Sequence, residues 1–341
     1  MNIAVRLPNW LGDTVMAVPT LVAIRAAWPQ DRVLAAGPWA ALLAQQGLAD
    51  VLADYPRAWR GRLRAADTVC AFAPELAVVL PNSLESALAA WYWGARRRVG
   101  FASSGRSTLL TDAVPVPAER SHQVDEYLLL VERTGAPVAT REPALRPPAP
   151  DSDIGAEARR LLDDAGAPPR RTRPRIAIHL GAAYGPAKLW PLGRVTEFCR
   201  LLAAEDATPI LLGAPGDAPT AAAIAAAAHV VSLVGRDRPA LLPAVLAGID
   251  VLVSGDTGVA HLAAALGTPV VALFGPTDPR LSAPRGRAAV VTHPVPCAPC
   301  FYRVCPIEHP CLHGIEPADV YKRAMALMEV PAAPKGAASL R

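Results

Sequence analysis

The stretch that decides the fold is DVLVSGDTGVAHLAAALGTPVVALF, residues 250–274. Residues 250–254 and 269–274 are apolar runs of strand length, and residues 257–266 between them have the pattern of a helix. Gly267 lies where a glycine commonly ends a helix. The stretch therefore predicts a strand, a helix and a second strand in direct succession.

The same alternation extends in both directions from this stretch. The expected strands are residues 2–7, 32–36, 67–72, 76–80, 98–101, 175–180, 209–213, 230–234, 250–254 and 269–274. The expected helices are residues 14–27, 83–94, 156–165, 191–204, 218–228, 239–247, 257–266 and 316–328. Strands that alternate with helices predict an α/β protein whose parallel sheets are covered on both faces.

The chain of 341 residues suits two domains of roughly 150 residues each. Residues 141–174 are so rich in proline that neither a sheet nor a long helix can continue through them. We therefore expect a first domain at 1–150, a linker at 151–174, a second domain at 175–330 and a disordered tail at 331–341.

Composition excludes several classes of protein. With 52% hydrophobic residues the chain can form a buried core, and a net charge of +4 is small for an obligate nucleic-acid binder. The start of the chain has neither a leader peptide nor a long apolar segment, and six cysteines in this length do not form a disulfide scaffold. These features predict a cytoplasmic globular protein.

In parallel sheets, ligands bind where a strand gives way to a helix. The first such turn, PNWLGDT at residues 8–14, places the carboxylate of Asp13 at a helix start, where it is a candidate catalytic base. Alternatively, Asp13 only caps the helix. Pro19 implies that this helix either kinks or begins at Pro19 itself.

The turn SGDTGVAH, residues 254–261, precedes the helix of the opening stretch. The N–H groups at that helix start suit a phosphate or diphosphate, to which Thr257 can add a hydroxyl donor, and His261 lies one helical turn further on. Alternatively, Asp256 or Thr257 is an ordinary helix cap and His261 packs inward.

A third turn, GAAYGPAKLWP at residues 181–191, carries Lys188 on a glycine-containing loop. An ammonium there suits a phosphate oxygen, although a loop lysine is also commonly just solvated. The loop lacks the glycine-lysine-serine/threonine run of a Walker A motif, so a kinase or ATPase is disfavoured.

Two further segments leave alternatives open. In AWYWGARRR, residues 90–98, three aromatic residues adjoin three arginines, which suits an anionic acceptor or a membrane surface, or else a partly buried helix end. Near the C-terminus, four cysteines with three histidines nearby suggest a zinc or iron–sulfur site, or else structural thiols. These residues are Cys297, Cys300, Cys305, Cys311, His293, His309 and His313.

Six stretches in order resemble glycosyltransferase family 9, in its lipopolysaccharide heptosyltransferase II group, over about residues 2–328. They are LPNWLGD (7–13), LPNS (80–83), HQV (122–124), GAAYGPAKLWP (181–191), SGDTGVAH (254–261) and FGPTDP (274–279). The resemblance implies a GT-B fold, in which two Rossmann-like domains with parallel sheets face each other across a cleft. The N-terminal domain would bind the acceptor and the C-terminal domain the nucleotide sugar.

The resemblance also implies an activity, namely inverting transfer of L-glycero-D-manno-heptose from ADP-heptose to the heptosyl-Kdo-lipid A inner core in lipopolysaccharide biosynthesis. No metal or other cofactor would be required, no nucleic acid would be bound, and the enzyme would work in the cytoplasm, at the cytoplasmic face of the inner membrane. A structural metal at the cysteine array would lie outside the shared donor site.

Residue by residue, the resemblance assigns Asp13 as the general base, and Lys188 with the backbone of Thr257 and Gly258 as the diphosphate contacts. Asp256 and His261 match positions near the sugar or the phosphates. In addition, Asp217 matches an acidic contact to the ribose.

Three alternatives remain open at this point. One is a family 9 transferase for another ADP-sugar or acceptor, and another is a non-catalytic nucleotide-binding protein of the same fold. The third is a metal-binding interaction module built on the cysteine array. The presence of Asp13 favours an enzyme.

Overall fold

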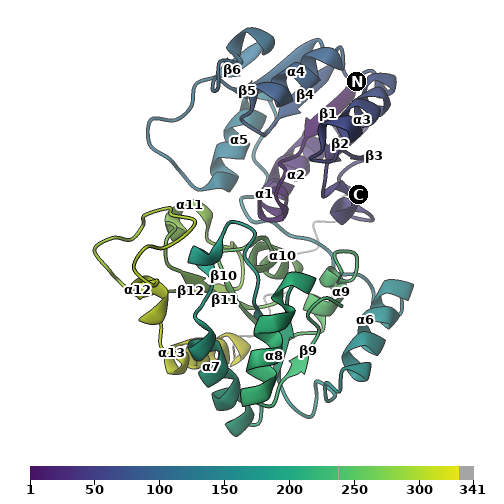
Figure 1. The fold of residues 1–341 in the computed structure, drawn as a ribbon. Helices are drawn as coiled ribbons and strands as arrows, with labels where there is room; N and C mark the ends of the chain where they lie inside the picture. Colours follow the sequence, from purple (N-terminus) through teal and green to yellow (C-terminus); the bar gives the residue numbers. More distant parts are fainter. Residues whose placement is uncertain (237, 330–341) are drawn as a thin grey trace. The chain divides into compact units, whose positions relative to one another are not determined.

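The computed structural model describes residues 1–236 and 238–329, so the expected tail at 331–341 lies outside the described residues. The chain forms two compact units, one of residues 1–146 with 280–282 and one that begins at Pro147 (Figure 1). Each unit contains one six-stranded parallel sheet. The predicted α/β class with two Rossmann-like sheets is confirmed.

The first sheet has the strand order β3-β2-β1-β4-β5-β6. Its strands are β1 (Asn2–Arg6), β2 (Arg32–Gly37), β3 (Val51–Asp54), β4 (Leu76–Val79), β5 (Arg97–Phe101) and β6 (Asp112–Val114). The order reverses between β1 and β4, which pair directly. Such a switch point, at the carboxyl ends of the strands, is where open α/β sheets bind ligands.

Helices cover both faces of the first sheet. On one face, α3 (Trp59–Phe72) and α4 (Leu84–Tyr92) pack on the strand residues around Ala4 and Val79. The alternate strand residues Ile3 and Val5 are also fully buried, because α2 (Val18–Ala27) and α5 (Gln123–Thr134) pack together on the other face.

Two predictions for the first unit need correction. Residues 67–72 are not a strand but the end of α3, where Val69 and Phe72 lie three residues apart and face the core. A short apolar run is compatible with a strand or a helix, and here the spacing of the buried residues is that of a helix. The predicted helix 14–27 is two helices, α1 (Leu11–Met16) and α2, separated at Ala17, and Pro19 occupies the first turn of α2, where proline is tolerated.

The second sheet has the order β12-β11-β10-β7-β8-β9. Its strands are β7 (Arg175–His179), β8 (Thr208–Leu212), β9 (Val231–Ser232), β10 (Val251–Gly255), β11 (Val270–Phe274) and β12 (Ala288–Thr292). Here the order reverses between β7 and β10, so a second switch point lies where these two strands end.

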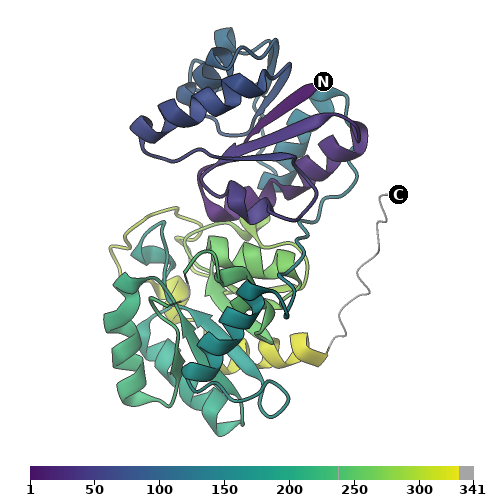
Figure 2. The same ribbon diagram turned by 90° about the vertical axis from the view of Figure 1, so that its right-hand side faces the viewer.

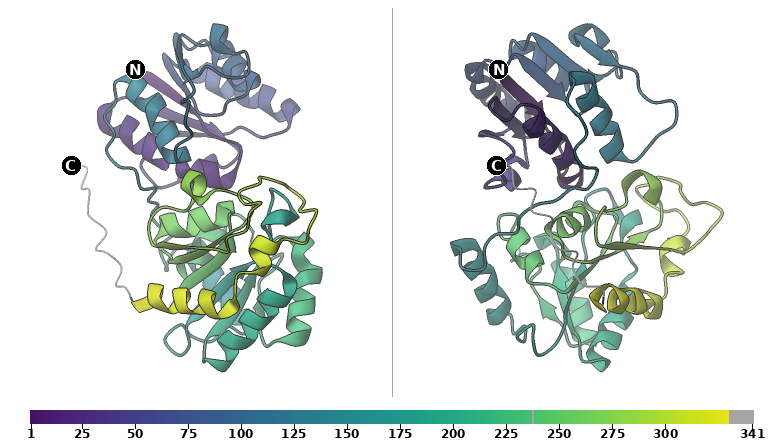
Figure 3. Two further views of the ribbon diagram at one scale, coloured as in Figure 1. Left: turned by 90° about the vertical axis from the view of Figure 1, so that its left-hand side faces the viewer. Right: turned by 180° about the vertical axis from the view of Figure 1, so that it is seen from behind.

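On one face of the second sheet, α7 (Leu192–Ala204), α8 (Ala218–Ala227) and α13 (Pro317–Glu329) form a layer. α13, at the yellow end of the colour scale in Figure 3, contacts β10, β11 and β12. The other helices, α6 (Asp153–Asp164), α9 (Leu242–Ala247) and α10 (Gly258–Leu266), pack in sequence against one another. The remaining short helices are η1 (Ala40–Leu43), η2 (Ser107–Leu109), η3 (Pro186–Lys188), η4 (Pro215–Asp217), α11 (Pro279–Ser282) and α12 (Pro310–His313).

Residues 151–174, expected as a linker, are part of the second unit. Within them α6, drawn in teal in Figure 2, packs on α9, and Glu157 forms an ion pair of 2.5 Å with Arg238. The apolar side of α6, with Ala158 and Leu162 buried, holds it against the unit. Among the described residues, no helix has the length and apolar character to cross a membrane.

Candidate active site

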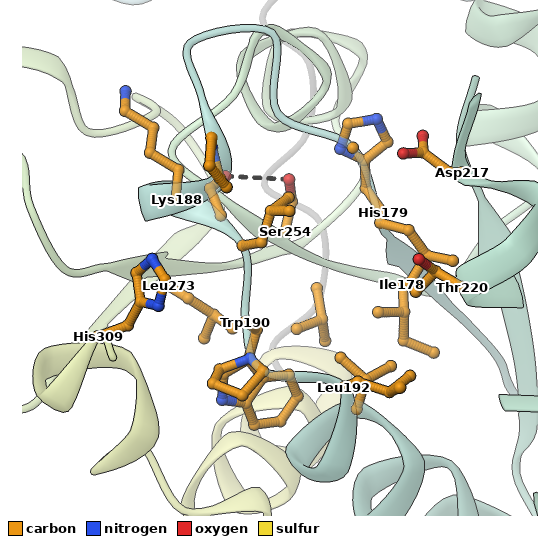
Figure 4. Close-up of a pocket in the computed structure, with 18 of the residues that line it drawn as sticks. Ile178, His179, Lys188, Trp190, Leu192, Asp217, Thr220, Ser254, Leu273 and His309 are labelled. Carbon is orange, nitrogen blue, oxygen red and sulfur yellow. Dashed lines mark hydrogen bonds between the residues drawn. The ribbon is translucent and has the colours of Figure 1, made fainter. Parts of the chain in front are cut away.

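A cavity of about 460 Å³ lies at the switch point of the second sheet. His179 ends β7, Gly255 ends β10, and both line the cavity together with Lys188 and Asp217 (Figure 4). Figure 4 also shows Trp190 and Leu192 on the apolar side of the cavity. The cavity therefore combines an apolar wall with charged groups at the strand ends, as small-molecule sites do.

Lys188 and Asp256 form a buried ion pair. The ammonium Nζ lies 2.5 Å from Asp256 Oδ2, and the two side chains are only 10% and 7% exposed. Nζ also donates to the Asp256 carbonyl at 3.2 Å, and the Thr277 hydroxyl donates to Asp256 Oδ2 at 2.8 Å. An ammonium has three N–H donors, so a third can serve a phosphate oxygen. Lys188 is thus held in place and is not a solvated loop lysine.

Gly255 allows the two turns that carry this pair to approach each other. A Cβ atom at residue 255 would lie 2.5 Å from the carbonyl oxygen of Lys188, which is closer than real Cβ contacts. Glycine is therefore required there for steric reasons. The loop 181–191 and the turn 254–261, predicted separately from the sequence, come together through this contact.

Thr257 is the N-cap residue of α10, but its side chain makes no capping hydrogen bond. Instead, its hydroxyl lies 2.9 Å from Ser254 Oγ and 3.5 Å from Nδ1 of His179. Ser254 in turn donates to the carbonyl of Gly255 at 3.0 Å, the dashed line in Figure 4. Thr257 therefore occupies the N-cap position, as the structural alternative had it, but its hydroxyl faces Ser254 and His179 instead of capping the helix.

His179 was not predicted from the sequence. Burial lowers its pKa to about 4, and the carboxylate of Asp217 only partly offsets this effect. The imidazole is therefore neutral at physiological pH. Because it ends an expected strand, the rule that strand ends carry ligand contacts was the signal that could have identified it.

Asp217 occupies the end of η4, after β8. Its Oδ2 accepts a hydrogen bond of 2.8 Å from the backbone N–H of Ala214, and its carboxylate faces His179 in Figure 4. Cβ atoms at Gly181 or Gly213 would each lie 2.8 Å from this oxygen. Two glycines therefore leave room for the carboxylate at the cavity wall.

The other predicted residues of the turn 254–261 lie in α10. Gly258 is its first residue, at the positive end of the helix dipole. His261, one turn further, is 5% exposed and packs inward, as the structural alternative had it. The fold thus places Lys188 and Asp217 in the cavity wall, whereas Asp256 and Thr257 contact the lining residues Lys188 and His179 and His261 is buried in α10.

Asp13 lies in the first unit, in the first turn of α1. The N-cap of α1 is Trp10, without a side-chain capping bond, so the prediction that Asp13 is the N-cap is wrong. Its Oδ1 is 3.4 Å from the hydroxyl of Tyr127 on α5. Burial raises the pKa of Tyr127 well above its usual value, and the charge of Asp13 raises it further. The phenol therefore stays protonated and donates toward the carboxylate.

Buried arginines hold the two turns at the switch point of the first sheet. Arg6, fully buried, donates to Asn9 Oδ1 at 2.8 Å and lies 4.5 Å from the ring centre of Tyr55. Burial lowers its pKa to about 10, which still leaves it charged at neutral pH. Asn9 lies in the motif at residues 7–13, so Arg6 fixes the turn that leads to Asp13.

Arg106 has the same role in the motif at residues 80–83. It is fully buried and donates to the Phe101 carbonyl at 2.9 Å, to Ser86 Oγ at 3.0 Å and to Asn82 Oδ1 at 3.2 Å. The turn after β4 is therefore held by one guanidinium that distributes its donors over several acceptors. Neither arginine was identified from the sequence.

The cysteine array is not assembled into a metal site. Cys311 is buried and Cys297 is exposed, and burial, with the neighbouring thiols, raises the pKa of Cys311. Within residues 1–236 and 238–329, no group of three or more Cys, His, Asp or Glu side chains is arranged to hold a metal ion. The geometry thus does not fit a preformed site, and a metal at these thiols stays a prediction.

The sequence profile of glycosyltransferase family 9 (heptosyltransferase) matches residues 62–310. The chain belongs to glycosyltransferase family 9. The match includes both turns that form the cavity, whereas Asp13 precedes it.

Two relatives match most of the chain, including part of the stretch that precedes residue 62. The lipooligosaccharide heptosyltransferase 2 of Haemophilus influenzae is 26% identical, over 85% of this chain and 88% of the relative. The lipopolysaccharide heptosyltransferase 2 of Salmonella typhimurium is 28% identical, over 85% and 87% of the two chains. The predicted family and the predicted class of enzyme, a glycosyltransferase, are confirmed.

Solved structures agree with this assignment. The structure of E. coli ADP-heptose LPS heptosyltransferase II is similar with a TM-score of 0.78 at 25% identity, covering 96% of this chain and 98% of that one. A family 9 glycosyltransferase from Veillonella parvula has a TM-score of 0.84 at 19% identity, over 96% and 97% of the two chains, which shows the shared fold.

Proposed function

We propose that the enzyme transfers L-glycero-D-manno-heptose from ADP-heptose to the heptosyl-Kdo-lipid A inner core, with inversion, during lipopolysaccharide core biosynthesis. The relatives named heptosyltransferase 2 support this donor and this acceptor, because they match most of the chain. The observation that carries the proposal is a cavity at a sheet switch point that is lined by the buried Lys188 and by Ser254 and Gly255, which directly precede the N-terminus of α10.

The donor binds mainly through its diphosphate. The N-terminus of α10, at Thr257 and Gly258, supplies backbone N–H groups for the diphosphate, and Lys188 adds a fixed positive charge. Asp256 orients Lys188. Asp217, which lies near His179, accepts hydrogen bonds from the ribose hydroxyls. His261 supports the helix start from within α10. Because these groups stabilise the departing ADP, transfer requires no metal ion.

Asp13 acts as the general base. It takes the proton from an acceptor heptose hydroxyl while that oxygen forms a bond to the anomeric carbon of the donor. The bond from this carbon to the diphosphate oxygen breaks at the same time, and ADP leaves with the electron pair. Attack from the side opposite to the leaving group inverts the anomeric centre. The acceptor is a lipid, which places the reaction at the cytoplasmic face of the inner membrane.

The decisive experiment measures ADP release by the purified enzyme with a panel of ADP- and UDP-sugars. Each donor is combined with Kdo-lipid A or with heptosyl-Kdo-lipid A as acceptor. We expect turnover with ADP-heptose and the heptosylated acceptor, unchanged by a metal chelator. Faster turnover with another ADP-sugar or acceptor would reassign the substrates within the family. Absence of turnover with every pair, despite ADP binding, would indicate a non-catalytic protein.

A further inference from the structure

Helix α4 exposes an apolar side to solvent. Its residues Leu84, Leu88, Trp91 and Tyr92 are 51%, 48%, 55% and 57% exposed. Spacings of three and four residues place these side chains on one side of the helix. The opposite side packs into the unit through Ser86, Ala87, Ala89 and Ala90. A surface helix normally exposes charged residues, so the exposed apolar side of α4 indicates a binding surface.

The neighbouring helix α3 enlarges the apolar area. Leu63 is 59% exposed, and α3 packs directly against α4 (Figure 1). Glu85, which carries the one negative charge of α4, forms an ion pair of 3.0 Å with Arg62 of α3. We call Leu63, Leu84, Leu88, Trp91 and Tyr92 the α3–α4 surface.

Exposed arginines lie close in sequence to the residues of the α3–α4 surface. Arg60 and Arg64 are exposed on α3, and Arg96 is exposed shortly after α4, whereas Asp67 is an exposed carboxylate of α3. Tryptophan and tyrosine prefer the zone between lipid headgroups and acyl chains, and arginines attract anionic headgroups. The combination of exposed aromatic residues, leucines and arginines is typical of a segment that lies in a membrane interface.

We propose that the α3–α4 surface binds an anionic lipid bilayer, with the leucines and aromatic rings inserted among the lipids and the arginines at the headgroups. Charge favours this occupant over a second copy of the chain, because two copies joined through this surface would bring their arginines together. An anionic bilayer instead neutralises them.

The topology connects this surface to the proposed acceptor site in the same unit. β4 pairs in parallel with β1, and α4 follows β4 through residues 80–83, just as α1 and Asp13 follow β1. The start of α4 and Asp13 therefore lie at the same edge of the sheet. On the proposed function, an acceptor that stays anchored by its acyl chains meets the enzyme at the edge nearest the bilayer.

The second unit offers a control surface. Residues Phe301, Tyr302, Val304 and Ile307 are also large, apolar and exposed, by 48%, 59%, 68% and 59%. The arginine in this segment, Arg303, lies 5.2 Å from the ring centre of Tyr184, in its own unit. A double substitution there removes a similar amount of exposed apolar surface without touching α4.

The test is co-sedimentation of the full-length enzyme with vesicles, without donor or acceptor. One vesicle type contains phosphatidylcholine alone, and the other also contains phosphatidylglycerol. We expect binding to the anionic vesicles, weakened by salt and lowered at least about tenfold in L88Q/W91Q. The double variant R64Q/R96Q should lose about fivefold per arginine on anionic vesicles only. The control V304Q/I307Q should bind like the unchanged enzyme.

L88Q/W91Q should keep the circular dichroism spectrum and the thermal unfolding temperature of the unchanged enzyme, which shows that it is folded. If it folds poorly, R64Q/R96Q alone tests the proposal through its dependence on vesicle charge. Equal vesicle binding by L88Q/W91Q and the unchanged enzyme overturns the proposal, as does loss of binding in V304Q/I307Q alone. A dimer in light scattering that L88Q/W91Q dissociates would assign the surface to self-association. The vesicle assay contains neither donor nor acceptor, so its result does not depend on whether the proposed heptosyl transfer is correct.

Discussion

At the scale of single residues, Asp13 and Asp256 each have a hydrogen-bonding partner from a distant part of the chain. The Asp13 carboxylate receives the hydroxyl of Tyr127, and the Asp256 carboxylate receives the ammonium of Lys188. These contacts therefore hold the two carboxylates in position.

For Asp13, the substitution D13N should lower turnover by about 10²- to 10⁴-fold while ADP affinity changes little, because a general base acts mainly in the transition state. Y127F should have a smaller effect, because it removes one hydrogen bond to Asp13 but leaves the carboxylate itself. Steady-state kinetics measures both. Normal turnover in D13N would reject the assigned base.

For Lys188, K188M should weaken ADP binding by about 2 kcal/mol, because a charged contact to phosphate is lost. It should also lower stability, since Asp256 is left buried without its ammonium. The double variant K188M/D256N should regain stability but not affinity. Calorimetric titration with ADP and thermal unfolding separate the two effects. Recovery of affinity in the double variant would place the phosphate elsewhere.

For His179, the pKa of about 4 in the folded protein lies below the ordinary value of 6.5. The unfolded chain therefore binds the proton first as pH falls, and stability present above about pH 6.5 is lost on the way to pH 4. Over this range the free energy of unfolding should fall by about 1 to 3 kcal/mol more than in H179Q. Urea unfolding at several pH values tests this, and parallel curves for the two proteins would contradict it.

At the scale of elements, the site depends on how closely a loop and a turn approach each other. The carbonyl of Lys188 lies over Gly255, the last residue of β10, where no Cβ fits. The position of η3 relative to the start of α10 therefore depends on the glycine at residue 255.

The substitution G255A should move the loop 181–191 and weaken ADP binding by about tenfold or more, while the unit still folds, because the contact involves backbone that must shift. The matched control is G193A in α7, where an added Cβ meets no atom within 4 Å. Equilibrium binding of ADP to both variants is the measurement. Equal affinities would show that the loop and the turn do not form the nucleotide site together.

At the scale of the whole molecule, each unit repeats the same sheet order with its own switch point. The proposed donor groups lie in the second unit, whereas Asp13 and Tyr127 lie in the first. Nucleotide binding and proton abstraction are therefore assigned to separate folding units.

Hydrogen exchange of the full-length enzyme tests this division. Saturating ADP should slow exchange in residues 181–191 and 254–261 and raise the thermal unfolding temperature, because a ligand that binds only the folded state stabilises it. A non-binding nucleoside serves as the control. Protection confined to residues 8–14 would contradict the assignment of the donor site to the second unit.

The sequence by itself determined the parallel α/β architecture, the family, and the turns that carry Asp13, Lys188 and Thr257. Local conformation can be predicted from apolar runs of strand length and from the positions of glycine and proline. Several motifs in the same order indicate membership of a family. The short strands β3, β6 and β12 were not predicted, and residues 67–72 were predicted as a strand, because short segments resemble both structures.

Only the tertiary structure decided which side chains meet. The contacts of Lys188 with Asp256, of His179 with Thr257 and of Tyr127 with Asp13 join residues 68, 78 and 114 positions apart. No periodicity in the sequence encodes such distances, since they follow from strand order and from packing at the switch points. The sequence already drew attention to residues 90–98, but only the structure showed that Leu84, Leu88, Trp91 and Tyr92 are exposed on one side of α4.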